Sequence, residues 1–234
     1  MSNNLIHLLS DGLLYFMQAS ILIPMAVVWR RRGQFPPAVK LLSWYVYLSA
    51  GCVGLAMLYP AYLPNNYGVL VGFNLGKMAL LGAVYFQVLP AGPMRRVVLF
   101  STVSCIIGVC PVIGYDLQIA VFVARVTQCA LLAALALVYM EHTLGRPAGR
   151  SLFQDPLWLL SVGQLFYSAG TISAFSFNFL SRNSLFDVST KFIFVSISGL
   201  VFNWFLTLAF LRAGRNPSTV AETANAPVRE FARF

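Results

Sequence analysis

The sequence predicts an all-α polytopic membrane protein, folded as a bundle of seven transmembrane helices. The chain of 234 residues is 59% hydrophobic and only 10% charged, whereas about a quarter of the residues of a soluble domain are charged. Its apolar residues fall into seven long stretches. The arginines and lysines between these stretches lie almost entirely in alternate connections, as the connections of a membrane protein require.

Each apolar stretch is long enough to cross a hydrocarbon core of about 30 Å at 1.5 Å per helical residue. The first is followed directly by Arg30, Arg31 and Arg32, and no basic residue precedes it. This pattern is typical of a retained span and not of a cleaved signal peptide. The predicted spans are Leu5–Val28, Leu41–Tyr59, Val69–Leu89, Val97–Gly114, Leu117–Tyr139, Leu157–Leu180 and Lys191–Leu211.

The basic residues predict the orientation of the bundle. Only Arg182 and Lys191 fall on the side opposite to the majority, and cytoplasmic connections carry the excess of arginine and lysine. The N-terminus is therefore predicted outside and the C-terminus in the cytoplasm, in a cell membrane that we expect to be a bacterial inner membrane. Residues 1–211 form the expected transmembrane domain, and residues 212–234 a short, disordered cytoplasmic tail. The majority consists of Arg30, Arg31, Arg32, Lys40, Arg95, Arg96, Arg146, Arg150, Arg212, Arg215, Arg229 and Arg233.

Composition and motifs argue against several function classes. The net charge of +9 is spread over span ends, so nucleic acid is not an expected partner. The two histidines, His7 and His142, lie near the predicted interfaces, so we expect no haem, no metal site and no other cofactor. Without a GxSxG, HExxH or phosphate-loop motif we expect no catalytic residues, and an intramembrane hydrolase is the weaker alternative. The four cysteines form no CxxC pair and are typical of buried thiols.

Polar residues recur at helical spacing in five of the spans. Polar faces avoid lipid, so these faces should converge on the interior of the bundle. The second and fourth spans lack such faces and are predicted to be peripheral, with the third and seventh central. The faces consist of Asp11, Tyr15 and Gln18 in the first span, Asn74, Lys77 and Tyr85 in the third, Arg125 and Gln128 in the fifth, Gln164, Ser168, Thr171 and Asn178 in the sixth, and Ser196, Gly199 and Asn203 in the seventh.

Small residues four apart mark two further faces. Gly72 and Gly76 form a GxxxG pair in the third span, and Gly170 with Ala174 forms a similar pair in the sixth. Such pairs allow helix backbones to approach closely. We expect close packing within one bundle, with a homodimer contact as the alternative.

Three ionisable residues inside the spans are the candidates for a functional site, because charges within a bilayer are costly unless paired or hydrated. Asp11, Lys77 and Arg125 all fall in the predicted outer half of the membrane. One interpretation is a structural ion pair between Asp11 and one of the cations. The other is a positive cavity that binds an anion from outside, with Arg125 as its bidentate partner and Lys77 as a point charge. The predicted ligand-binding residues are Asp11, Gln18, Asn74, Lys77, Arg125, Gln128, Gln164 and Asn203.

One resemblance rests on short motifs. Several stretches of the chain are similar to a pattern in uncharacterised bacterial seven-span membrane proteins. They are Asn65-Asn66-Tyr67, Asp155-Pro156-Leu157-Trp158, then Gly163, Tyr167 and Gly170, and then Asn203. The resemblance implies a seven-span fold and no activity, and a carboxylate is expected in that pattern where this chain has Lys77. The chain also lacks a lysine midway along its last span, which argues against a rhodopsin-type retinal linkage there.

The sequence thus predicts a non-enzymatic sensor or accessory protein that binds a small anion or amphiphile from the outer side. The short connections leave no room for an output domain, so a separate cytoplasmic or membrane protein is the expected partner, alongside the lipid bilayer. A small-solute transporter or channel is the first alternative, favoured by the polar face that reaches Gln164. A structural subunit of a membrane complex is the second.

Overall fold

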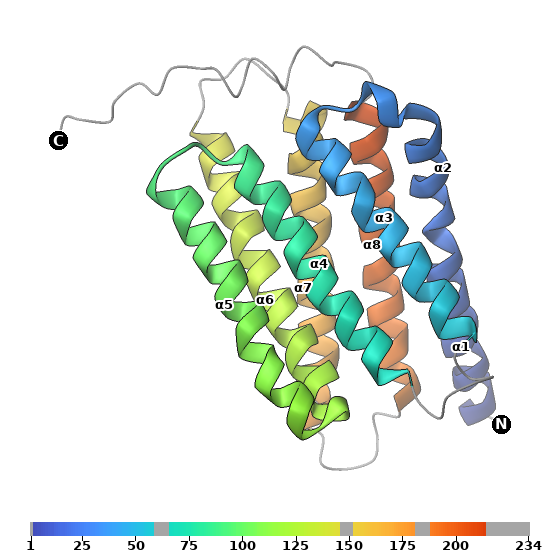
Figure 1. Cartoon of the computed structure of the whole chain (residues 1–234). Coiled ribbons are helices and arrows are strands. Elements are labelled where there is room, and N and C mark those ends of the chain that lie inside the picture. Colours follow the sequence, from blue (N-terminus) through green and yellow to red (C-terminus); the bar gives the residue numbers. More distant parts are fainter. Residues whose placement is uncertain (1, 59–65, 146–151, 181–187, 214–234) are drawn as a thin grey trace.

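The computed structural model describes residues 2–58, 66–145, 152–180 and 188–213, and most of the predicted tail lies outside them. All regular structure within these ranges is helical. Its helices lie side by side in one bundle (Figure 1), with the start of the first and the end of the last at opposite ends. They are α1 (Ser2–Ser20), α2 (Leu22–Arg31), α3 (Pro37–Leu58), α4 (Tyr67–Val88), α5 (Pro93–Tyr115), α6 (Leu117–Leu144), α7 (Pro156–Leu180) and α8 (Val188–Ala213), with short 3₁₀ turns η1 (Arg32–Gln34) and η3 (Leu152–Gln154).

Six helical segments are long and apolar enough to cross a membrane, so the predicted membrane-embedded helical fold is supported. Helix α7, which carries Ser161, Gln164, Ser168 and Thr171, is not among the segments found in the described residues. The count of seven spans and the orientation of the termini stay predictions. The six segments are Leu8–Gln34, Pro37–Ala56, Tyr67–Val88, Pro93–Tyr115, Leu117–Leu144 and Phe192–Ala213.

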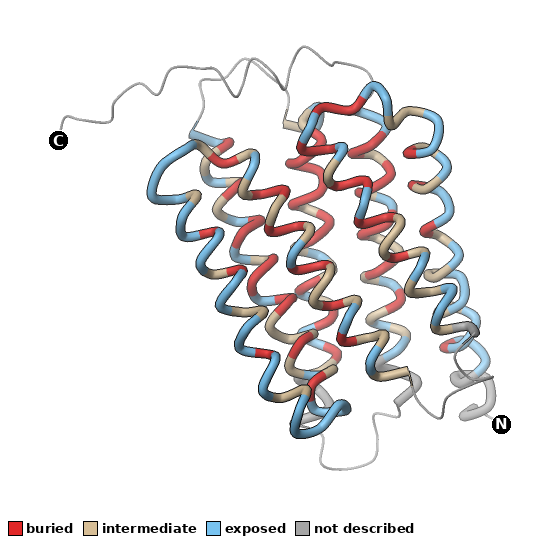
Figure 2. Tube along the Cα trace, in the orientation of Figure 1, coloured by how far each residue is buried: buried red, intermediate tan, exposed pale blue. Residues whose placement is uncertain are grey.

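Helices α4, α6, α7 and α8 build the interior. Helix α4 packs against α3, α5 and α6, while α7 packs against α6 and α8. Figure 2 shows buried residues on the facing sides of these helices, and α5 exposed along most of its length. The peripheral position predicted for the fourth span, now α5, is therefore confirmed. The same prediction for the second span is wrong, because α3 buries Leu42, Tyr45 and Val46 in the core.

The first predicted span is broken between α1 and α2. Pro24 has no N–H to donate to the carbonyl of Ser20, so the hydrogen-bond ladder is interrupted one turn before it. Asn203 of α8 supports the break, since its Nδ2 donates to Ser20 Oγ at 2.7 Å and to the Met17 carbonyl at 3.4 Å. Asn203 therefore joins α8 to α1. Its predicted role as a ligand contact stays a prediction.

Two aspartates fix the starts of helices at opposite ends of the bundle. Asp116 caps α6 by accepting the N–H groups of Gln118 and Ile119. Asp155 accepts the N–H of Leu157 at 2.9 Å and the hydroxyl of Tyr139 at 2.5 Å. An aspartate followed by proline is typical of a helix N-terminus. The Asp-Pro-Leu-Trp motif of the resemblance thus serves as the first turn of α7.

Arginines hold the helix ends at the predicted cytoplasmic side. Arg95 donates to the carbonyls of Phe86 at 2.6 Å and Gln87 at 3.2 Å, at the last turn of α4. Arg31 donates to the Leu211 carbonyl near the end of α8. Such contacts satisfy carbonyls that have no partner within the helix. Part of the basic charge predicted to face the cytoplasm is thus used within the fold.

Helices α7 and α8 approach each other at two glycines. A Cβ atom on Gly163 would lie 2.7 Å from Cβ of Phe205, and one on Gly170 would lie 2.8 Å from Cβ of Ser198. Both distances are shorter than real Cβ contacts allow, so only glycine fits at these positions. The prediction of close packing within the bundle is confirmed for Gly170. Gly72, in contrast, has open space beside it.

Candidate polar site between helices α4, α6, α7 and α8

Polar side chains from four helices gather at one level of the bundle. Along its own helix, each of these residues lies roughly ten positions, or about 15 Å, from the end of the bundle at which α1 and α8 begin. The packing of α6 against α4 and α7, and of α7 against α8, brings these stretches together. The group contains Asn74 and Lys77 of α4, Arg125 and Gln128 of α6, Thr171 of α7 and Ser196 of α8.

Lys77 is the most enclosed charge of the described chain, with 1% of its surface exposed. Its Nζ lies 3.8 Å from the ring centre of Tyr167, 4.5 Å from that of Phe202 and 5.5 Å from that of Tyr45. Each ring attracts an ammonium through its π face, by about 2 kcal/mol when water is excluded. Three helices thus form an aromatic cage (Tyr45, Tyr167 and Phe202) around an amine of a fourth.

Arg125 is the second cation of the group. Its guanidinium carbon lies 5.3 Å from the ring centre of Phe175 on α7, and its Nε is buried without a hydrogen-bond partner in the described structure. Arg125 is close enough to act electrostatically on Lys77. Neither cation forms an ion pair with a carboxylate among the described residues. A buried ammonium and a half-buried guanidinium therefore lie near each other without a carboxylate as counter-ion in the described residues.

Several amides and hydroxyls of the group also lack partners. Gln128 is fully buried, and within the described structure neither its Oε1 nor its Nε2 is hydrogen-bonded. The same holds for Asn74 Nδ2, Thr171 Oγ1 and Ser196 Oγ. Buried polar atoms almost always have a partner, and each exception costs about 1–3 kcal/mol. Their concentration around Lys77 and Arg125 favours water or a bound molecule at this level.

A line of polar side chains continues from this level along α7. Cys129 of α6 lies beside Ser168 and Thr171 and acts electrostatically on Lys77. Gln164 Nε2 donates to Ser168 Oγ at 2.9 Å, and its Oε1 has no partner in the described residues. One turn further, Ser161 Oγ lies 3.0 Å from the hydroxyl of Tyr85. The polar line thus runs from the cations toward the end of α7 that Asp155 caps.

Asp11 lies apart from the two cations. Its side chain is exposed on α1, and α1 packs mainly against α8. The interpretation in which Asp11 pairs with Lys77 or Arg125 is therefore wrong, because α1 and α6 lie on opposite sides of α8. Gln18 is half-buried on the same helix. Asn203, as described above, is occupied at the break between α1 and α2.

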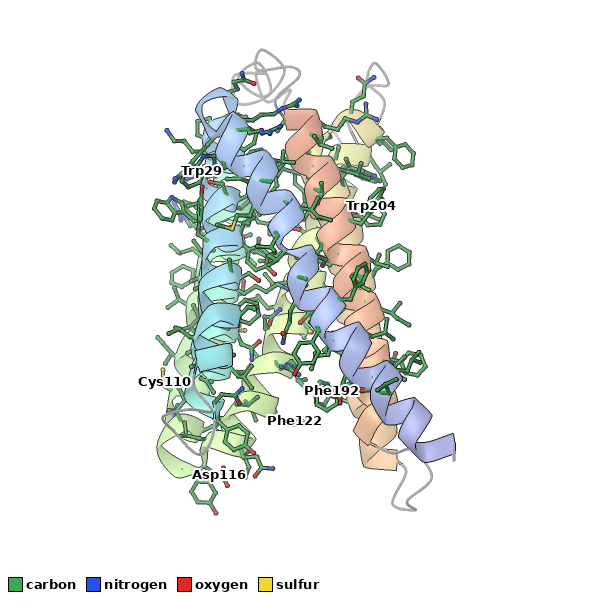
Figure 3. All side chains as sticks on the ribbon, turned by 90° about the vertical axis from the view of Figure 1, so that its right-hand side faces the viewer. Trp29, Cys110, Asp116, Phe122, Phe192 and Trp204 are labelled. Atoms are coloured by element: carbon green, nitrogen blue, oxygen red, sulfur yellow. The ribbon has the colours of Figure 1, made fainter. Side chains whose placement is uncertain are left out.

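The residues that surround Lys77 were not predicted from the sequence. Tyr45 and Phe202 lie on spans with many other aromatic residues, and Tyr167 belongs to the motifs of the resemblance without a predicted role in the site. Many other rings of the bundle are exposed, and Phe122, Phe192 and Trp204, which are labelled in Figure 3, are three of them. Nothing in the spacing along one chain separates such lipid-facing rings from the three that face the amine.

The arrangement suits an anion better than a metal ion or a general acid–base pair. No group of three or more His, Cys, Asp or Glu side chains able to hold a metal occurs in the described residues. The donors near the centre are an ammonium, a guanidinium and amides, which all bind oxyanions. Comparison with protein-family models, with curated proteins and with solved structures finds no match.

Proposed function

We propose that this chain is a non-enzymatic membrane sensor or accessory protein that binds a small anionic or amphiphilic ligand between α4, α6 and α7. One observation supports this proposal above all: Lys77 and Arg125 lie near each other without a carboxylate, beside the unpaired amides of Asn74 and Gln128. A bound oxyanion supplies the missing charge and accepts the free N–H groups. Arg125 provides planar, bidentate recognition and Lys77 a point charge.

The proposed ligand acts through a separate protein, because the described connections are too short for an output domain. Helix α7 is the element best suited to report binding. Its polar line connects the level of Lys77 to Ser161 and Tyr85, and Asp155 at its first turn holds Tyr139 of α6. A shift of α7 on ligand binding therefore changes the end of the bundle where the arginines lie.

Replacing Arg125 with alanine should abolish stabilisation by the ligand. An anion present at 100 times its Kd stabilises the native protein by about 2.7 kcal/mol, and this increment should disappear in the variant. The measurement is thermal unfolding of the purified protein in detergent, with phosphate, sulfonates and carboxylates of increasing chain length. Arg96→Ala, at an exposed position, is the control and should keep the full stabilisation. Equal stabilisation of both variants would reject Arg125 as a ligand contact.

A small-solute transporter is the second candidate, because the polar line along α7 continues past the middle of the bundle to the Tyr85 and Ser161 hydroxyls. This candidate predicts flux of the stabilising anion into liposomes that contain the protein. Leucine in place of Gln164 should reduce that flux at least tenfold, since it removes the amide that is hydrogen-bonded to Ser168 from this line. Stabilisation without flux would favour the sensor, and neither effect would favour a structural subunit.

A further inference from the structure

The amine of Lys77 has surroundings that suit a nucleophile. It is 99% enclosed, forms no ion pair in the described residues and has Arg125 as a cationic neighbour. Enzymes and carriers that use a lysine as a nucleophile activate it in two ways, by removing it from water and by placing another cation beside it. Both conditions are met at Lys77. Lys40, in contrast, is exposed and does not meet the first condition.

We propose that Lys77 binds its ligand covalently and reversibly, as an imine with an anionic aldehyde or ketone. This inference rests on the proposed function, because the oxyanion of the same ligand is the group that Arg125, Asn74 and Gln128 receive. It goes further in naming the ligand class: a small molecule that carries a carbonyl and an oxyanion. The unpartnered Nδ2 of Asn74 and both free atoms of Gln128 are the observations that point to a bound molecule.

The step is balanced without any oxidant or reductant. Nζ of Lys77 attacks the carbonyl carbon and forms a carbon–nitrogen bond, while the carbonyl oxygen takes up a proton and the nitrogen releases one. The hydroxyl then leaves as water together with the second proton of the nitrogen, which leaves a C=N bond to Nζ, and addition of water reverses the reaction. The hydroxyl of Thr171 and the amide of Gln128, both without partners in the described chain, are the polar groups near which this water can leave.

The aromatic cage adds a preference within this class. The rings of Tyr167 and Phe202 have their centres 3.8 and 4.5 Å from Nζ, so a group joined to this atom lies against two π faces. A flat, conjugated carbonyl compound gains contact area there, whereas a branched aliphatic one does not fit as closely. Cys129 interacts electrostatically with Lys77, and its thiol is the competing nucleophile to be tested.

Pyridoxal 5′-phosphate is a suitable probe because it combines an aromatic aldehyde with a phosphate. The full chain is purified in detergent, incubated with the probe, reduced with borohydride and analysed by peptide mass spectrometry. We expect Lys77 to be labelled at a probe concentration at least tenfold lower than Lys40, which serves as an internal reference. Arg125→Ala, and pyridoxal without its phosphate, should each lower labelling of Lys77 at least tenfold and leave Lys40 unchanged. Cys129→Ser should leave the labelling of Lys77 intact.

Labelling of Lys40 without labelling of Lys77 would overturn the imine, and Lys77 would then be a cation that the aromatic cage merely encloses. If phosphate still stabilised the protein in that case, through Arg125, the proposed anion site would stand alone. If Lys77 were labelled equally by the probe with and without its phosphate, and equally in Arg125→Ala, the imine would stand and the anion site would be rejected. The amine would be reactive, but no anion site would direct the ligand to it. Lys77→Arg, which keeps the charge and removes the nucleophile, should show no label at this position.

Discussion

Replacing Gly170 with leucine should lower the free energy of unfolding by about 3 kcal/mol, at the upper end of what overpacking costs. Even the first added carbon would lie 2.8 Å from Cβ of Ser198, and the remainder of the leucine would lie against α8 near Phe194. Overpacking of a tight contact typically costs about 1–3 kcal/mol, and α7 and α8 share the most extensive contact between any two of the described helices. Thermal or denaturant unfolding in detergent measures the loss.

Two further variants separate this packing effect from helix propensity. Gly170→Ala should cost less than the leucine variant, and the double variant with Ser198→Gly should recover most of the loss, because the opposing Cβ is removed. Gly72→Ala is the matched control on α4, where nothing lies within 4 Å of the added carbon. It should change stability by no more than about 1 kcal/mol. Equal losses at Gly72 and Gly170 would contradict a specific contact between α7 and α8.

The sequence was sufficient for the general fold because the bilayer restricts the choice. Backbone groups in lipid must be hydrogen-bonded within the segment, so long apolar stretches such as Val69–Leu89 and Leu117–Tyr139 become helices. Of their observed counterparts, α4 (Tyr67–Val88) nearly matches the predicted bounds, and α6 (Leu117–Leu144) begins at the predicted residue and continues past Tyr139. The break after Ser20 was harder to predict. Pro24 alone weakens the helix, but Asn203, which supports the break, is remote in sequence.

The polar residue pairs that each helix contributes to the candidate site could be predicted from the sequence. The residues that other helices place beside these pairs could not. Helical spacing placed Asn74 with Lys77, and Arg125 with Gln128, each pair on one helix face. Which faces meet depends on the order of helices around the bundle, and no local pattern encodes that order. Asp11 has the same spacing as the others, yet its helix packs on α8, so it joins neither cation. The aromatic cage depends on the same order, since it combines α3, α7 and α8 around α4.

Lys77→Met should separate the structural and functional roles of the buried amine. Methionine has a similar length and a polarizable sulfur that contacts aromatic rings favourably, so Tyr167 and Phe202 keep a partner. Replacing a buried charge that lacks a counter-ion with an apolar side chain removes its desolvation cost. We therefore expect the free energy of unfolding to stay the same or to rise. Anion binding, in contrast, should weaken by about 2–3 kcal/mol, or roughly 30- to 150-fold, because a charge-assisted hydrogen bond is lost.

Lys77→Ala is the informative counterpart of the methionine variant. It removes the same charge but leaves the space between the three rings unfilled, so stability should fall by about 2–4 kcal/mol through the cavity alone. If the protein serves to bind an anion, the two variants lose binding alike and differ only in stability. If Lys77 instead holds the bundle together through its charge, methionine destabilises as strongly as alanine does. The unfolding free energies of the two variants are compared, and stabilisation by phosphate is measured on each. Together these measurements decide whether the buried charge of Lys77 supports the fold or binds a ligand.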